Sequence, residues 1–366
     1  MQISNQITKR LPRILGLITL LTCVPLTARA DAGTPLMWAG MIHLVLGNAI
    51  IGIFEGFILA RIFKLKSNVC VLAMIVANYF SAWGGGLFLN YQITKSLPFN
   101  LYNAWHWIWV MVFVTFVITL ILEWPFVFFC FRKEQNRLKK SLLGNLLVNS
   151  LSYVLLFWWY SSASGTTLFT KANIVQPSEI KFPKEGLVYF ISETNGVCRF
   201  DFSSRQIEKV CSLEAEKNDR LFVRASAFGT NDWDILDSSK RILVCSNLQV
   251  TAVPFWRDTN NLEGTMFNFG AAPKLGNAEK SNWNFRTGFW AIEGIHGVNT
   301  NSGENIHLSL ETPFVSWNAR NAMQLPEDYV VFQLGDDQIC LFETATRKIA
   351  LLARGQGPIV VLPKEN

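Results

Sequence analysis

Charged residues are scarce in this chain. Asp, Glu, Lys and Arg make up 16% of its 366 residues, whereas half of the residues are hydrophobic. This balance favours a membrane protein over an ordinary soluble one. The net charge of +6 lies largely in short loops between apolar runs and at the amino terminus. Because basic loops of this kind orient membrane helices, we expect no nucleic-acid partner.

Sequence signatures of catalysis and metal binding are also missing. The chain has no Gly-x-Ser-x-Gly, no His-Glu-x-x-His, no calcium loop and no Cys-x-x-Cys-His. His43 and His106 fall in the outer halves of two predicted helices, where they are either haem or metal ligands or interfacial hydrogen-bonding residues. We therefore predict no catalytic residue, no metal and no cofactor, and we favour a protein that is not an enzyme.

Four long apolar runs occupy the first half of the chain. Each is long enough to cross a bilayer, which takes about 20 residues. The runs are Leu36 to Phe63, Val69 to Leu89, Ala104 to Cys130 and Leu142 to Tyr160. We predict a transmembrane domain of four helices over residues 31–162, with the lipid bilayer as its surroundings.

The loop Arg132 to Lys140 sets the orientation of these helices. It carries five basic residues against the single acid Glu134. Basic loops stay on the cytoplasmic side, so the fourth helix runs outward and delivers the rest of the chain to the external side. Trp and Tyr gather at the predicted outer ends, which agrees with this orientation. We expect a multi-pass protein of the bacterial cytoplasmic membrane with a periplasmic carboxyl-terminal domain.

The first thirty residues resemble a secretory signal peptide. Lys9, Arg10 and Arg13 precede an apolar core from Ile14 to Leu26, and Ala28-Arg29-Ala30 follows as a cleavage site. The alternative is an uncleaved first helix. Both interpretations place Asp31 outside.

Two carboxylates lie within the predicted spans, Glu55 in the first and Glu123 in the third. A charged carboxylate that faces lipid costs about 2.5 to 3.5 kcal/mol or more, so both are expected to face the bundle interior. Helical spacing puts them in one polar layer with Asn48, Asn78 and Asn149. One interpretation is that the layer binds a cation or relays protons. The other is that neutral carboxyls hold the helices in register.

The second half of the chain contains an internal repeat. Glu185 to Val210 aligns without a gap on Glu327 to Leu352, at an offset of 142 residues. Each copy predicts three short strands joined by tight turns. We expect residues 163–184 to be a linker and residues 185–366 to be an all-β domain. Its fold is predicted to be a small or irregular β-propeller, with a two-sheet sandwich as the alternative.

Cysteines of an external domain can form disulfides. If the turn at Ser203 to Gln206 is a four-residue hairpin, Cys198 stands opposite Cys211, and we predict a bridge between them. The alternative is that both are small buried hydrophobic residues. Cys245 with Cys340 is a second candidate pair.

These patterns leave three functions open. The first is an envelope protein whose β-repeat domain binds a protein or a glycan as a scaffold or sensing module. The second is an ion- or proton-coupled transport component that uses Glu55 and Glu123. The third is a membrane enzyme or redox carrier that uses His43 and His106. We favour the first, with a second envelope protein as partner, because repeat β domains are mainly interaction surfaces.

Overall fold

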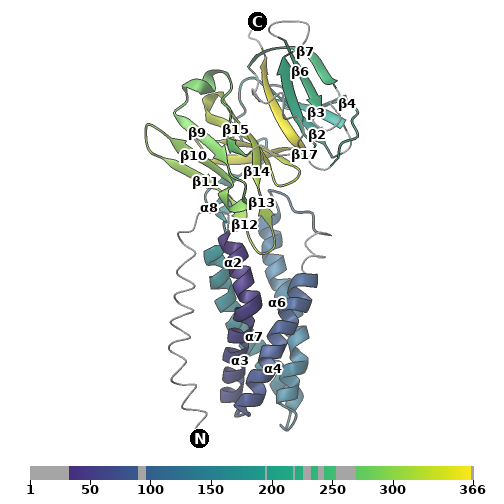
Figure 1. Cartoon of the computed structure of the whole chain (residues 1–366), viewed down its shortest axis with the longest axis vertical. Coiled ribbons are helices and arrows are strands. Elements are labelled where there is room, and N and C mark those ends of the chain that lie inside the picture. The colour runs from purple at the N-terminus through teal and green to yellow at the C-terminus, as the bar shows by residue number, and fades with distance from the viewer. Residues whose placement is uncertain are drawn as a thin grey trace.

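The computed structural model describes residues 33–89, 96–193, 196–216, 219–225, 232–237, 243–252 and 269–363. Figure 1 shows two parts stacked along the long axis, a helical part and a β part that covers one end of it. The predicted signal peptide, residues 1–30, lies outside the described residues.

The helical part contains four helices that are long and apolar enough to cross a membrane. They cover Pro35–Phe63, Ser67–Gly85, Ala104–Cys130 and Arg137–Ala163. The elements are α2 (Pro35–Ile42), η2 (His43–Gly47) and α3 (Asn48–Phe63) in the first, α4 (Ser67–Phe80) and η3 (Ser81–Leu89) in the second, and α6 (Ala104–Cys130) and α7 (Arg137–Ala163). The four apolar runs are confirmed as long helices.

Small residues let α3 and α4 approach each other closely. A Cβ atom at Gly52 would lie 2.5 Å from the Cα of Ile75, and one at Gly56 would lie 2.5 Å from the Cα of Val71. Both distances are far below van der Waals contact, so glycine is required at both positions. Gly52 and Gly56, four residues apart on one side of α3, therefore form the face that packs on α4, as small residues at this spacing do in membrane bundles.

The basic loop lies at the end of the bundle opposite the β part. It connects the carboxyl end of α6 to the amino end of α7 (Figure 1). Arg132 lies 4.4 Å from the centre of the Phe129 ring, and Arg137 lies 5.1 Å from that of Phe128. Lys140 pairs with Glu134 at 2.8 Å. The cations thus remain at the helix ends, outside the apolar length of the bundle.

The β part is built on one curled, mainly antiparallel sheet. Its strands run in the order β14-β15-β16-β17-β2-β3-β4, and β7, β6 and β5 are joined to the far end of β17. The strands are β2 (Leu187–Ser192), β3 (Gly196–Asp201), β4 (Ile207–Cys211), β5 (Leu221–Ala225), β6 (Asp232–Asp237), β7 (Leu243–Ala252), β14 (Ala319–Leu325), β15 (Tyr329–Leu334), β16 (Gln338–Glu343) and β17 (Lys348–Pro363). Two-residue β1 (Asn173–Ile174) adds in parallel beside β17.

Two three-stranded units of this sheet have the same pairing at an offset of 142 residues. Leu187 pairs with Asp201 in the first unit, and Tyr329 pairs with Glu343 in the second. The register shifts between Val197 and Cys198 in one unit and between Ile339 and Cys340 in the other. The turn residues Arg205 and Arg347 both have positive φ, 58° and 54°. The two segments that align in sequence therefore have matching strands, bulges and turns.

The expectation of separate propeller blades is not supported. The first half of β17 pairs with β16, and its second half pairs with β2. One long strand thus joins the two units edge to edge by hydrogen bonds. Blades of a propeller are separate sheets arranged around an axis, whereas here the units form one continuous sheet.

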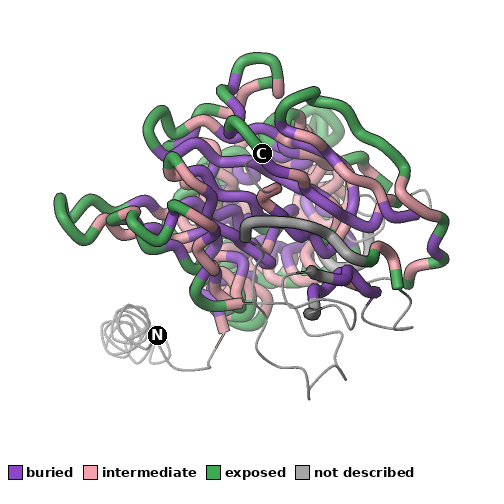
Figure 2. The backbone as a smooth tube through the Cα atoms, turned by 90° about the horizontal axis from the view of Figure 1, so that it is seen from above, coloured by how far each residue is buried: buried purple, intermediate pink, exposed green. Residues whose placement is uncertain are grey.

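A second sheet covers one face of the first. It contains β8 (Gly270–Ala271), β9 (Trp283–Thr287), β10 (Ile295–Asn299) and β11 (Asn305–Leu308). Phe285 and Ile306 from this sheet share a hydrophobic cluster with Phe332 and Phe342. The alternate residues Val331 and Leu341 belong to a cluster on the opposite face. Figure 2 shows the resulting band of buried backbone through the β part. The β part is therefore a curled antiparallel sheet with a smaller sheet packed on one face.

Contacts between the helices and the β part fix the junction. The short strand β12 (Leu310–Glu311) makes two backbone hydrogen bonds with Gly165, just beyond α7, at 2.8 and 2.9 Å. The Glu311 carboxylate also accepts a hydrogen bond from the Thr34 hydroxyl at 2.6 Å, and Thr34 caps α2. In the loop before α6, the Leu101 amide donates to Gln338 Oε1 at 2.7 Å. The β part is therefore attached to the start or end of three helices.

The segment predicted as a linker, residues 163–184, takes part in this packing. It includes the short helix α8 (Thr167–Thr170) and strand β1. Leu168 belongs to the cluster shared with the second sheet, and Ile180 and Phe182 belong to the cluster on the other face of the large sheet. The segment is thus a packed connection between the two parts.

Candidate functional site

The two carboxylates predicted to lie within the spans face the interior of the bundle. Glu55 lies on α3 and is fully buried, and Glu123 lies on α6 and is 1% exposed. The surrounding surface positions are apolar, with Phe113 and Val154 both 67% exposed. The polarity of the bundle is therefore concentrated inside.

Glu55 is held by the neighbouring helix α4. Asn78 donates its side-chain N–H to Glu55 Oε2 at 2.5 Å and to the Met74 carbonyl at 3.0 Å. The other carboxylate oxygen, Oε1, is buried and has no hydrogen-bond partner among the described residues. A buried polar atom without a partner is costly. The Ser152 hydroxyl on α7 is near enough to interact with the Glu55 carboxylate, but it makes no hydrogen bond of normal geometry with Oε1.

Glu123 is bound by side chains from two other helices. The Ser81 hydroxyl, where α4 passes into η3, donates to Oε1 at 2.6 Å. Asn149 on α7 donates to Oε2 at 3.1 Å. Asn149 also contacts the Asn145 carbonyl at 3.1 Å, and Asn145 donates to the Leu120 carbonyl at 2.8 Å. The layer thus ties α4, α6 and α7 together.

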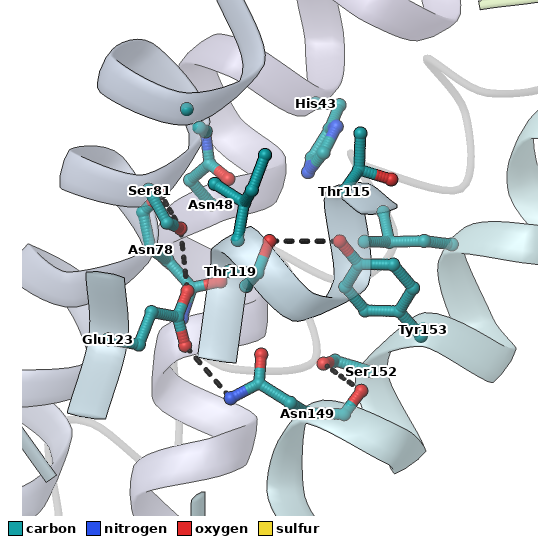
Figure 3. A pocket seen from close by; sticks show the side chains of 14 residues that line it. His43, Asn48, Asn78, Ser81, Thr115, Thr119, Glu123, Asn149, Ser152 and Tyr153 are labelled. Carbon is teal, nitrogen blue, oxygen red and sulfur yellow. Dashed lines mark hydrogen bonds between the residues drawn. The ribbon is translucent and has the colours of Figure 1, made fainter. Parts of the chain in front are cut away.

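A cavity of about 120 Å³ opens beside Glu123 (Figure 3). Its polar lining comes from all four long helices: His43, Asn48, Asn78, Ser81, Thr115, Thr119, Glu123, Asn149, Ser152 and Tyr153. The Thr119 and Tyr153 hydroxyls lie 2.9 Å apart across α6 and α7. A polar cavity of this size holds several water molecules.

Two π-helical segments border the cavity. The segment η2 begins at the lining residue His43, and η3 begins at the lining residue Ser81. In a π turn the regular hydrogen bonds are interrupted, and such turns are frequent at functional sites. The second long helix also binds η2, because Tyr79 of α4 and Trp83 of η3 donate to the carbonyls of Val45 and Leu44. The helices are thus irregular at the level of the cavity.

The electrostatics of the site require a positive species. Glu55 and Glu123 are linked through Asn78 and Ser81, because the Asn78 side chain donates to Glu55 and Ser81 Oγ lies 3.1 Å from the Asn78 carbonyl and 2.6 Å from Glu123 Oε1. Among the residues that the structure describes, the side chains that line the cavity include no Lys or Arg. Two like charges in a medium of low dielectric repel strongly, so the pair needs a proton or a cation to be stable. Chemically, the arrangement can bind a proton, bind a small cation or exchange one for the other.

The structure brings together the residues predicted as a polar layer. Glu55 contacts Asn78, and Glu123 contacts Asn149, whereas Asn48 lines the same cavity but donates to the Leu44 carbonyl at 3.3 Å. The two histidines are not a pair. His43 faces the cavity and its Nδ1 lies 2.7 Å from the Tyr160 hydroxyl, whereas His106 is exposed beside Trp107.

Several lining residues were missed from the sequence. The missed residues include Thr115 and Thr119. They recur at four-residue spacing with the predicted Glu123, which places all three on one face of α6. This polar stripe was visible in the sequence and predicts a shared cavity wall. The two π-helical segments had no recognisable signal, because their sequences are as apolar as their surroundings.

The predicted bridge between Cys198 and Cys211 is wrong. Both thiols are free, as are those of Cys245 and Cys340. The register shift after Val197 is the physical reason. It pairs Cys211 with Val197, and it pairs Cys198 with Lys209. A prediction based on a regular hairpin could not include this extra residue.

The described residues contain no group of three or more His, Cys, Asp or Glu side chains that could hold a metal ion. The sequence matches no known family model and no curated protein with significant similarity. The candidate site must therefore be interpreted from its own geometry.

Proposed function

We propose that this protein is an ion- or proton-coupled component of a membrane, and that Glu55 and Glu123 are the residues that carry the coupling. The observation that supports this most directly is the buried carboxylate pair beside a cavity whose described lining residues include no basic side chain except His43. A structural pair would be expected to be fully satisfied by the protein, whereas Glu55 Oε1 has no partner among the described residues. Ionisable groups within membrane helices are costly and mark ion and proton pathways.

The proposal places the four helices across a bilayer. Their apolar length and the exposed apolar side chains along their surface support this placement. The basic loop at one end and the β part at the other support an orientation with the loop in the cytoplasm and the β part outside. In a bacterium, the membrane would be the cytoplasmic one and the β part would be periplasmic.

The β part would then respond to the state of the bundle. The hydrogen bonds from Thr34, Leu101 and Gly165 join it to helix starts and ends that lead directly to the cavity. A change in the packing of α2 or α6 on ion binding would reach the β part through these contacts. Coupling of this kind needs two packing arrangements with different affinities for the ion.

Flux measurements on reconstituted protein test the proposal. Full-length protein is reconstituted into proteoliposomes, and a membrane potential is imposed. The vesicle interior should then acidify, as reported by an internal pH dye, or take up a small cation, as reported by an internal dye for that cation. The variants Glu55→Gln and Glu123→Gln should each lower this rate at least about tenfold, because a proton-binding group is removed. Glu134→Gln, in the basic loop, is the matched control and should keep the wild-type rate. A rate equal to that of protein-free vesicles, or equal rates in all variants, would contradict the proposal.

A second candidate is an interaction module, favoured by one loop of the β part. Residues 300–304, between β10 and β11, are all exposed. The loop is nevertheless shaped, because Asn299 Oδ1 accepts the backbone amides of Asn301 and Ser302 at 3.0 and 3.1 Å. A preformed polar loop suits a protein or glycan partner. A photocrosslinker at position 302 should give a discrete adduct in intact cells, and the absence of any protein or glycan adduct would count against this role.

A further inference from the structure

The cavity beside Glu123 presents oxygen atoms rather than N–H groups. Asn48, Asn78 and Asn149 each donate their side-chain amide to a backbone carbonyl, those of Leu44, Met74 and Asn145. A backbone carbonyl cannot donate, so the NH₂ group of each asparagine must face it and the Oδ1 atom must point the other way. No donor to the Oδ1 atoms of these three asparagines is found among the described residues. Their carbonyl oxygens therefore remain available.

The hydroxyl groups of the lining add to this set of acceptors. The Thr115 hydroxyl donates to the Met111 backbone carbonyl at 2.8 Å, and the Ser152 hydroxyl donates to the Asn149 backbone carbonyl at 3.1 Å. Ser81 donates to Glu123. Since a hydroxyl has one proton and two lone pairs, a hydroxyl that donates elsewhere still offers an acceptor. The polar part of the wall thus consists of carbonyl, hydroxyl and carboxylate oxygens together with the His43 ring, and apolar side chains such as Ile118 and Leu156 form the rest.

The size and charge of the cavity limit its ligand. Pockets for organic ligands are about 300 to 1,000 Å³, whereas this cavity measures about 120 Å³. Hard cations prefer oxygen ligands. A divalent ion is usually held by several carboxylates. In the described part of the chain, Glu123 is the one acidic side chain in the lining, and Glu55 lies behind Asn78. A single negative charge among neutral oxygens suits a monovalent ion.

The irregular helices favour the same ligand. Membrane ion sites commonly lie where helices are interrupted, because the interruption frees backbone carbonyls inside the membrane. The carbonyls of Leu44 and Val45 in η2 are occupied by donors from Tyr79 and Trp83. Ser81, Ala82 and Gly85 of η3 line the cavity directly. The η3 side is thus the part of the irregular backbone that can contribute to an ion site.

We propose that this cavity binds a small monovalent cation of the sodium class, held by the Glu123 carboxylate and by side-chain oxygens of Asn48, Asn78, Asn149 and Thr119. This inference rests on the proposed function, since it names the ion that the carboxylate pair would couple. Glu55 then acts behind the site through Asn78, whose Oδ1 atom it positions. Water molecules fill the rest of the cavity and complete the ion's shell.

Thermal unfolding tests the ion directly and without any transport. The purified full-length protein is unfolded in detergent at one pH and one ionic strength, with choline chloride replaced stepwise by NaCl. A ligand that binds only the folded state raises the midpoint in a saturable way, here by about 2 to 5 °C at roughly ten times the dissociation constant. Glu123→Gln should abolish the rise, and Glu134→Gln should keep it. An equal midpoint in choline and sodium, or an undiminished rise in Glu123→Gln, overturns the inference.

A second variant keeps the test valid if Glu123→Gln does not fold. Thr119→Val removes one lining oxygen but leaves the carboxylate, so the sodium dependence should persist with a dissociation constant about tenfold higher or more. Unchanged sodium affinity in Thr119→Val would remove Thr119 from the proposed ion shell and contradict the site as stated. The two proposals fail separately. If sodium raises the unfolding midpoint but the proteoliposomes show no flux, the sodium site stands and the proposed coupling is refuted. If the proteoliposomes show proton flux but sodium does not raise the midpoint, only the sodium site is refuted.

Discussion

The helical part and the β part bury opposite kinds of side chain. In the bundle, Glu55 and Glu123 are inside while Phe113 and Trp158 are 67% and 70% exposed. In the β part, strands β15 and β16 are buried at every position, and few large apolar side chains reach the surface. The difference is the one expected if the bundle lies in an apolar medium, as proposed above, and the β part lies in water. An exposed apolar side chain is therefore favourable on the surface of the bundle and unfavourable on the surface of the β part.

Packing in the bundle also depends on different residues from packing in the β part. The β part fills its two layers with Phe, Val, Ile and Leu from alternate strand positions. The contact of α3 with α4 instead depends on glycine, because the backbones themselves touch. Lipid offers no hydrophobic driving force for helix association, so close van der Waals contact must replace it.

The largest effect is expected from Gly56→Val. Its Cβ would lie 2.5 Å from the Cα and 2.7 Å from the backbone N of Val71, and a backbone cannot move aside as a side chain can. We expect a loss of more than about 3 kcal/mol in unfolding free energy, or failure to fold. Gly40→Ala on α2, where a Cβ meets nothing within 4 Å, is the matched control. Thermal unfolding in detergent measures both, and a wild-type midpoint for Gly56→Val would show that α3 and α4 do not pack as described.

A smaller effect is expected at the junction between the two parts. Burial raises the pKa of the Glu311 carboxyl above its ordinary value, while the hydrogen bond from Thr34 acts in the opposite direction. A raised pKa in the folded state means that ionisation of Glu311 costs more free energy in the folded protein than in the unfolded chain. Stability should therefore be highest below the ordinary pKa of about 4.3 and should fall as the pH rises through the raised value.

Two variants separate the parts of this prediction. Glu311→Gln should remove the decline with pH, because no charge can form. Thr34→Val should cost about 1 to 3 kcal/mol, since it leaves a buried carboxylate without its donor. Glu279→Gln, at an exposed carboxylate, is the control. Unfolding midpoints from about pH 4 to about pH 8 give the comparison, and a decline that persists in Glu311→Gln would assign it to another group.

Much of the bundle could be predicted because its signals are local. Apolar runs of sufficient length, basic loops and the spacing of Gly52 and Gly56 are properties of single segments. The grouping of Glu55, Asn78, Glu123 and Asn149 followed from depth counting at a constant rise per residue. The π-helical segments could not be predicted, since they depend on contacts between helices such as Tyr79 with Val45.

The β part could be predicted only within each repeat unit. The strands and turns of both units follow from sequence alternation, but the joining of the units through β17 depends on a pairing between distant segments. Likewise, the bulge at Val197 shifts the pairing of β4 with β3, so that Cys211 lies opposite Val197 and not opposite Cys198. A regular hairpin pattern in the sequence does not indicate this bulge. Local pattern thus determines strands here, and long-range pairing determines the sheet.

The smallest effect is expected for a carboxylate of the β part. Glu208 accepts hydrogen bonds from Arg199 at 2.7 and 3.0 Å, and both side chains are exposed, by 57% and 42%. Ion pairs in water are screened and contribute little, so Glu208→Ala should change the unfolding free energy by no more than about 0.5 kcal/mol, and by less in high salt. A double-mutant cycle with Arg199→Ala measures the pair alone. A coupling above about 1 kcal/mol would mean that this surface is not screened as water screens it, and the contrast drawn between the two parts would not hold at β3 and β4.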